Sequence, residues 1–116
     1  MELQWNKCQG YVWCNLNSVN LDHPHFNSMS GVYIIWHGGS PAATVRLGQG
    51  NIRERLATYR TDPAIQKYKH LDLYVTWASV PEASQDGVET YLAQKLSPIV
   101  GELFPKAAPI SVNLPW

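Results

Sequence analysis

The stretch of sequence that most constrains the fold lies at residues 71–80, LDLYVTWASV. Large apolar side chains occupy every second position of its first seven residues, and polar or smaller side chains fill most of the positions between them. Alternation with a period of two places the two sets on opposite faces of an extended chain, as in a β-strand. No other part of the chain predicts a strand as clearly.

A hairpin is predicted upstream of that strand. Residues 31–37, GVYIIWH, form a short run of β-branched and aromatic side chains, and ATVRLG at 43–48 is a second short strand candidate. The Gly-Gly-Ser-Pro sequence at 38–41 separates the two runs and is typical of a turn. We expect them to pair as antiparallel strands.

The spacing of apolar residues becomes helical after residue 50. Asn51 can cap the first turn, with Glu54 at the third helical position, and this helix is expected to end near Arg60. Asp62 followed by Pro63 predicts a second helix start, because Asp is a good cap and Pro is tolerated in the first turn. That second helix should have only one or two turns.

A further helix is predicted over residues 84–96, where Val88, Leu92 and Leu96 repeat at a spacing of four. Ser97 and Pro98 can then cap a short helical continuation. The apolar residues of that continuation would be Ile99, Val100, Leu103 and Phe104.

The order strand, strand, helix, strand, helix predicts an α+β fold in which helices cover a small antiparallel sheet of about three strands. A chain of 116 residues fits one domain. We divide it into an N-terminal arm at 1–30, the domain proper at 31–104 and an extended tail at 105–116. The arm should pack on the sheet, because its apolar side chains would otherwise form a large exposed patch: Trp5, Tyr11, Val12 and Trp13.

Composition predicts where the protein works. The chain has nine basic and nine acidic residues, so no overall positive charge argues for nucleic acid, and no segment approaches the roughly 20 apolar residues of a membrane span. We expect a cytoplasmic protein that does not enter membranes. Cys8 and Cys14 should then be a reduced pair, and their spacing to His23 and His25 matches no common zinc finger.

Four groups of residues occur in the order found in a known family. They are Gly31-Val32-Tyr33, Leu47-Gly48-Gln49, NIRERL at 51–56 with Tyr59, and Glu89 followed by Leu92 and Pro98. In this order, and in this strand and helix context, residues 31 to about 101 resemble the GIY-YIG nuclease domain. The interval from Glu89 to Pro98 and the pair Arg55 and Tyr59 are similar to the repair-nuclease branch of that family.

The resemblance implies an endonuclease that hydrolyses phosphodiester bonds of nucleic acid, with DNA as the expected substrate and one Mg²⁺ or Mn²⁺ as cofactor. By similarity, Glu89 would hold the cation, Arg55 would contact the scissile phosphate and Tyr33 would help to activate water, with Tyr59 beside them. These roles are chemically sensible, because one carboxylate plus waters can hold Mg²⁺ and the fork of an Arg fits phosphate oxygens.

Two residues depart from the family pattern. Arg46 stands where the second Tyr is expected, and Gly101 stands in place of an Asn. Arg46 cannot replace a Tyr hydroxyl in proton transfer, but it can bind phosphate, and we predict that role for Arg46 and Arg53. Both lie in a segment, residues 46–70, with six basic and two acidic residues and therefore a local charge of +4.

Further alternatives remain open from the sequence. The departures could leave a catalytically degenerate module that binds nucleic acid or protein. Trp36 either packs in the core or stacks on a base, and His37 is either a proton donor or merely exposed. The remaining tryptophans, at 5, 13, 77 and 116, are expected to pack in the core or at its edge. Substrate specificity would come from the arm, from a homodimer or from a partner protein.

Overall fold

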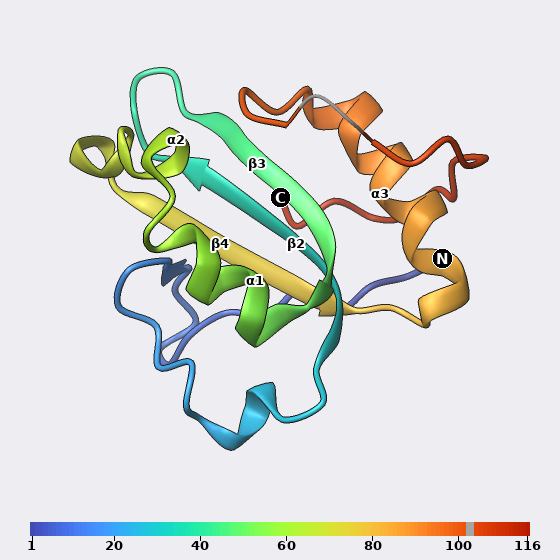
Figure 1. Ribbon diagram of the computed structural model, residues 1–116, viewed down its shortest axis with the longest axis horizontal. Helices are drawn as coiled ribbons and strands as arrows, with labels where there is room; N and C mark the ends of the chain where they lie inside the picture. Colours follow the sequence, from blue (N-terminus) through green and yellow to red (C-terminus); the bar gives the residue numbers. More distant parts are fainter. Residues whose placement is uncertain (102–103) are drawn as a thin grey trace.

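The computed structural model describes residues 1–101 and 104–116 and has an α+β fold around one antiparallel sheet (Figure 1). The strand order is β1-β4-β2-β3. The strands are β1 at Cys14–Asn15, β2 at Ser30–His37, β3 at Ala43–Asn51 and β4 at Leu73–Ser79. The prediction of an α+β fold with an antiparallel sheet is confirmed, but the sheet has four strands where about three were expected. The extra strand, β1, has only two residues and pairs with β4 at the edge of the sheet.

The helices are α1 at Ile52–Tyr59, α2 at Pro63–Gln66 and α3 at Glu82–Leu96, with short 3₁₀ turns at Pro24–Phe26 and Lys69–Leu71. Both predicted caps are present. Asn51 Oδ1 accepts a hydrogen bond from the Glu54 amide at 3.0 Å, and Asp62 Oδ1 accepts one from the Ala64 amide at 2.9 Å. These bonds satisfy amides that the first helical turn leaves without a partner.

The predicted helical continuation after Ser97 is wrong where the structure describes it, and its Leu103 lies outside the described residues. The chain instead runs along the edge of β3. The Ile99 amide donates to the Thr44 carbonyl at 3.1 Å and the Val100 amide donates to the Val45 carbonyl at 2.8 Å. These hydrogen bonds to an edge strand replace the ones that a helix would have made.

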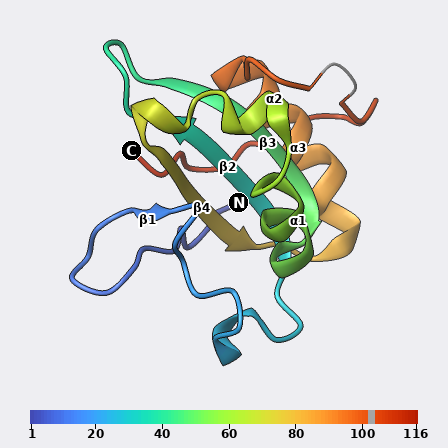
Figure 2. The same ribbon diagram turned by 60° about the vertical axis from the view of Figure 1, so that its left-hand side comes forward.

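The sheet is buried on both faces. Helices α1 and α2 and part of the arm cover one face, which carries Tyr33, Ile35 and Val75, whereas α3 and the tail cover the other, which carries Val32 and Ile34 (Figures 1 and 2). Strand β3 forms one edge of the sheet, so α1 and α3 approach each other around that edge. The candidate site lies there.

The N-terminal arm is part of the core. Leu16 and Phe26 are buried with the face that packs against α1, and Leu3 is buried on the opposite face. The expectation that the arm hides all its large side chains is wrong at its turn, where Tyr11 is 82% and Val12 is 57% exposed.

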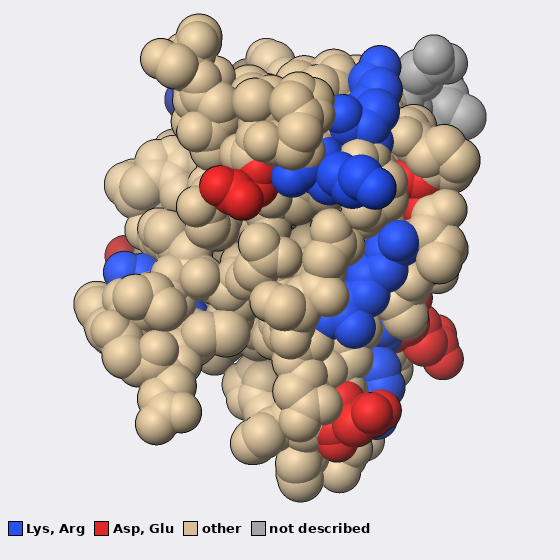
Figure 3. Space-filling model, turned by 90° about the vertical axis from the view of Figure 1, so that its left-hand side faces the viewer, with Lys and Arg blue, Asp and Glu red and all other residues tan. Residues whose placement is uncertain are grey.

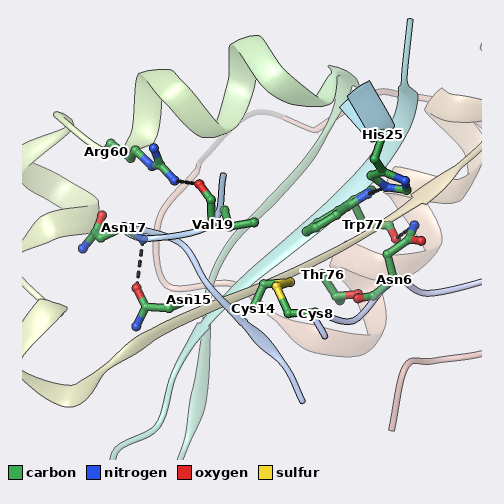
Figure 4. Close-up of a disulfide and its surroundings, with 10 residues drawn as sticks. All are labelled: Asn6, Cys8, Cys14, Asn15, Asn17, Val19, His25, Arg60, Thr76 and Trp77. Carbon is green, nitrogen blue, oxygen red and sulfur yellow. Dashed lines mark hydrogen bonds between the residues drawn. A yellow bond between two sulfur atoms is a disulfide. The ribbon is translucent and has the colours of Figure 1, made fainter. Parts of the chain in front are cut away.

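A disulfide joins Cys8 to Cys14, so the prediction of a reduced pair is wrong. A tight turn brings the cysteines together, because the Cys8 amide donates to the Val12 carbonyl at 2.8 Å. Figure 4 shows this disulfide within the arm, beside β4. Trp77 of β4 lies nearby, and its Nε1 donates to His25 Nε2 at 3.0 Å. Disulfides are rare in the cytosol, so this bond counts against the cytoplasmic location, which stays a prediction.

The tail runs between α3 and the start of the chain. The Ile110 amide donates to the Gly87 carbonyl at 2.9 Å, and the side chain of Asn113 exchanges hydrogen bonds with the backbone of Leu3. A Cβ at Gly87 would lie 2.6 Å from Ile110 Cδ1, so glycine allows this close approach. Among the described residues, no helix has the length and hydropathy needed to cross a bilayer.

Candidate functional site

A pocket of about 170 Å³ lies at the edge of the sheet where β3 passes between α1 and α3. It brings together five residues that the sequence analysis named as site candidates. They are Tyr33 from β2, Arg46 from β3, Arg55 and Tyr59 from α1, and Glu89 from α3. The first and last of these positions are 56 residues apart in the chain, so their meeting depends on the fold.

The pairing of β2 with β3 positions Tyr33 and Arg46. Tyr33 lies opposite Gly48, and a Cβ at Gly48 would collide with the Tyr33 hydroxyl and lie 2.9 Å from its Cζ. Glycine therefore lets the phenol lie over β3 and reach the pocket. A register shift between Ile35 and Trp36 marks a bulge in β3, and beyond it Arg46 pairs with Ile35 on the Tyr33 face.

The two tyrosine hydroxyls and Arg46 form a hydrogen-bonded chain. Tyr33 Oη and Tyr59 Oη are 2.6 Å apart, and Arg46 Nε donates to Tyr59 Oη at 3.0 Å while its guanidinium lies 5.1 Å from the Tyr59 ring centre. Burial raises the pKa of Tyr33 well above its ordinary value, and its hydrogen bond with Tyr59 raises it further. Tyr33 is therefore a neutral hydroxyl at physiological pH.

Arg55 extends from the first turn of α1 to the mouth of the pocket. Its side chain is exposed, and its Nε donates to the Gln49 carbonyl at 3.2 Å. Gly50 precedes the helix with a φ of +125°, and a Cβ there would lie 3.0 Å from Arg55 Nε. The turn therefore needs glycine for its backbone and for the space that Arg55 occupies.

Glu89 enters the pocket from α3, on the other side of the β3 edge. The residue is only 7% exposed. Burial raises the pKa of its carboxyl, and the charge of Asp86 one turn earlier adds to this rise, whereas Gln49, Arg46 and Arg55 oppose it. Gln49 also links α3 to β3, because its Nε2 donates to Asp86 Oδ1 at 2.6 Å. A desolvated carboxylate in a pocket gains from any cation that reaches it.

The donors in the pocket suit a cation that keeps much of its hydration shell. Within the described residues, no three side chains of His, Cys, Asp or Glu come together as a metal-binding group. Glu89 therefore offers a single buried carboxylate. Mg²⁺ commonly binds through one or two carboxylates, with waters and substrate phosphates completing the shell. The residues fit an open Mg²⁺ site that substrate helps to complete.

One of the two predicted phosphate contacts lies elsewhere. Arg53 instead reaches the arm: its Nε donates to the Leu21 carbonyl at 2.7 Å and its Nη2 to Asn27 Oδ1 at 2.8 Å. Arg60, another basic residue of segment 46–70, donates to the carbonyls of Leu16 and Val19, and Figure 4 shows the bond to Val19. Part of the positive charge of segment 46–70 therefore holds the arm in place.

Trp36 and His37 also lie away from this pocket. Trp36 lines a second cavity, on the sheet face that packs against α3. His37 is 7% exposed and stacks on Tyr68 with ring centres 5.4 Å apart, while its Nδ1 accepts a hydrogen bond from the Gly39 amide at 3.1 Å. These contacts give His37 a structural role.

The two departures from the family pattern lie side by side. Gly101 has a φ of +108°, and a Cβ at this position would lie 3.3 Å from Arg46 Nη1. The Arg46 side chain therefore occupies space that a side chain at position 101 would need. Sequence reasoning recorded both changes but gave no sign that they are neighbours, because 55 positions separate them.

Gln49 and Asp86 are pocket or near-pocket residues that sequence reasoning missed. Gln49 was noted only as part of a motif, and Asp86 stands on the exposed side of its helix. Their pairing follows from the approach of α3 to β3, which no local pattern reveals.

Comparisons of the chain with models of protein families, with curated proteins and with solved structures found no match. The functional argument therefore depends on the fold and on the geometry of the pocket. Membership of the GIY-YIG family stays a prediction.

Proposed function

We propose that this protein is a GIY-YIG-like endonuclease, which hydrolyses phosphodiester bonds of nucleic acid with one bound Mg²⁺ or Mn²⁺. DNA is the proposed substrate. The observation that carries the proposal is the convergence of Tyr33, Arg46, Arg55, Tyr59 and Glu89 on one small polar pocket. Tyr33, Arg55, Tyr59 and Glu89 are the site residues that the order of the sequence motifs predicts, and Arg46 is the residue that departs from that order.

Each side chain of the pocket has a suitable task. Arg55 uses Nε to bind the Gln49 carbonyl, which holds the guanidinium at the pocket mouth and leaves both Nη groups for phosphate oxygens. Arg46 uses Nε to bind Tyr59, so its Nη groups can neutralise charge that develops on the phosphate. Glu89 would hold the cation.

Tyr33 acts as a neutral hydroxyl in this scheme. Its raised pKa excludes a phenolate in the protein without bound cations, but its hydroxyl can hydrogen-bond to the attacking water and orient it, while the 2.6 Å hydrogen bond to Tyr59 holds the phenol in place. When bound, the divalent cation supplies positive charge that polarises the phosphate and lowers the pKa of water.

The surface charge supports a polyanionic substrate. Lys and Arg side chains follow one another along one side of the face seen in Figure 3, with acidic side chains beside them. Arg55, Lys67 and Lys69 are exposed members of segment 46–70. A small number of phosphate contacts gives weak binding that falls with increasing salt concentration.

A nicking assay tests the proposal. Wild-type protein should nick supercoiled or branched DNA with Mg²⁺ or Mn²⁺ and not with EDTA. Glu89→Ala should reduce the rate at least a hundredfold, because it removes the ligand of the cation, and Arg55→Met should reduce it strongly, because it removes a positive charge beside the reacting phosphate. Glu54→Ala is the matched control, since Glu54 is an exposed acidic residue on α1 outside the pocket. Nicking by Glu89→Ala at the wild-type rate would refute the assignment of Glu89 to the cation.

One observation favours a second candidate, a catalytically degenerate module that binds nucleic acid or another protein. Arg46 replaces an expected hydroxyl, and its positive charge opposes the rise that burial causes in the pKa of Glu89, as a cation would. In this alternative Arg46 substitutes for the metal. Wild-type protein would then bind DNA with the same affinity with and without Mg²⁺ and nick none of it.

A further inference from the structure

A second and larger pocket, of about 590 Å³, is lined by three tryptophans: Trp13 from the arm, Trp36 from β2 and Trp116 from the end of the tail. The ring centre of Trp36 lies 5.2 Å from that of Trp13 and 4.9 Å from that of Trp116, and the rings meet edge to face. Three distant parts of the chain therefore build one aromatic cluster.

This cluster is exposed to a degree that core packing does not explain. Trp116 is 57% exposed, and Trp13 and Trp36 are each partly exposed. Sequence reasoning assigned Trp13 and Trp116 to packing. Large aromatic surfaces left open to water usually mark a binding site. Because the rings are roughly perpendicular, a flat ligand that stacks on one ring meets the edge of another.

One lysine gives the aromatic pocket a positive border. Lys95 lines the pocket, whereas Lys7, whose Nζ lies 4.4 Å from the ring centre of Trp13, is outside its lining. Stacking rings beside cations are the combination with which proteins hold single-stranded nucleic acid, because every base has a flat face and every nucleotide carries a phosphate.

The aromatic pocket and the candidate nuclease pocket both reach the β3 edge of the sheet, from opposite faces. Thr44 lines the first and Arg46 lines the second, and the bulge between these two residues turns their side chains to opposite faces of the sheet. Ser97 and Gly101, at the two ends of the segment that pairs with β3, line the first and second pocket respectively. One strand of nucleic acid could therefore cross this segment and reach both pockets.

We propose that the pocket of Trp13, Trp36 and Trp116 binds an unpaired base next to the phosphate held by Arg55. This inference rests on the proposed nuclease function and names its substrate class, which is single-stranded or branched nucleic acid. Bases inside a duplex are stacked on each other and paired, so they cannot reach the tryptophans unless the duplex is first unpaired.

Fluorescence titration tests the inference without cleavage. Metal-free protein is titrated with oligothymidylate and, separately, with a blunt duplex of the same length. We expect oligothymidylate to quench the tryptophan fluorescence and to bind more tightly than the duplex. Trp116→Ala should weaken single-strand binding roughly five- to tenfold and leave duplex binding unchanged, because stacking on one aromatic ring contributes that much per base.

Trp116 is the preferred position because more than half of its side chain is exposed, so its removal disturbs little packing, and Trp36→Leu provides a second variant, in β2. The control is Ile99→Ala, since Ile99 is an apolar side chain that is 50% exposed and lies outside the lining of both pockets. Equal affinity for oligothymidylate and duplex, or unchanged single-strand affinity in both tryptophan variants, overturns the inference.

Two other occupants would also overturn it. Quenching by neutral oligosaccharides but not by oligothymidylate would assign the pocket to sugars. Dimerisation in sedimentation that Trp116→Ala abolishes, without an effect on oligothymidylate binding, would assign it to a second copy of the chain. Failure of the nuclease proposal is distinguishable, because it appears as absent cleavage while the metal-free titration still reports single-strand binding through Trp116.

Discussion

The hydrogen-bonded chain of Tyr33, Tyr59 and Arg46 makes an asymmetric prediction about two similar substitutions. Tyr33→Phe removes the end of the chain and leaves Tyr59 bonded to Arg46. A neutral hydrogen bond is lost, so the free energy of unfolding should fall by about 1 kcal/mol. Tyr59→Phe removes the middle of the chain.

The second substitution leaves two groups without their partner, the Tyr33 hydroxyl and the Arg46 Nε. Hydrogen bonds to charged groups contribute about 1.5–3 kcal/mol, but Arg46 is only partly buried, so water can replace part of that bond. We therefore expect Tyr59→Phe to cost about 2–3 kcal/mol, roughly twice as much as Tyr33→Phe. The double variant should cost less than the sum of the two, because both remove the same bond.

Urea unfolding at neutral pH, followed by circular dichroism, measures these differences, and equal denaturant slopes for all variants serve as the control. The raised pKa of Tyr33 adds a second readout. The folded phenol stays protonated when the unfolded one ionises, so stability should fall as pH rises above the unfolded value of about 10, and this fall should be smaller in Tyr33→Phe. A larger cost for Tyr33→Phe than for Tyr59→Phe would refute the arrangement.

Three further predictions concern other parts of the site and the arm. Glu89→Gln should raise the free energy of unfolding at pH 7, because burial raises the pKa of this carboxyl and its charged form is disfavoured; the gain should vanish as pH falls below the unfolded pKa. Urea unfolding at both pH values checks it. Cys8→Ser should lower stability by about 2 kcal/mol, the chain-entropy value for so short a loop, and dithiothreitol should lower wild-type protein to the same level while leaving the variant unchanged. Arg53→Met should lower the melting temperature and leave DNA affinity unchanged. Arg55→Met should leave the melting temperature unchanged and lower DNA affinity. Thermal unfolding and filter binding measure these two quantities.

The sequence was sufficient wherever a local pattern decides the structure. The alternation at residues 71–80 predicted β4, and the side chains of Asn51 and Asp62 predicted where α1 and α2 begin, because a cap needs only its own helix turn. The functional hypothesis required the site residues to lie close together. In the fold, the antiparallel register of β2 and β3 meets this requirement.

Other features depend on contacts between distant segments, and local patterns could not reveal them. The chain after Ser97 has helical spacing of apolar residues, yet its amides pair with the open edge of β3. The sequence predicts that Arg53 is available to bind phosphate, but carbonyls of the arm accept its hydrogen bonds. The tryptophan cluster requires the arm and the tail to meet beside β2, which only the complete fold determines.

We propose that Glu89 is a catalytic carboxylate in a nuclease site at the β3 edge. Plasmid nicking by Glu89→Gln tests it most directly, because this variant keeps the shape of the side chain and is expected to be at least as stable as wild-type protein. Nicking and urea unfolding are measured on the same samples with Mg²⁺. We expect Glu89→Gln to be folded and to nick the plasmid at least a hundredfold more slowly than wild-type protein. Nicking at the wild-type rate would contradict the catalytic role of Glu89.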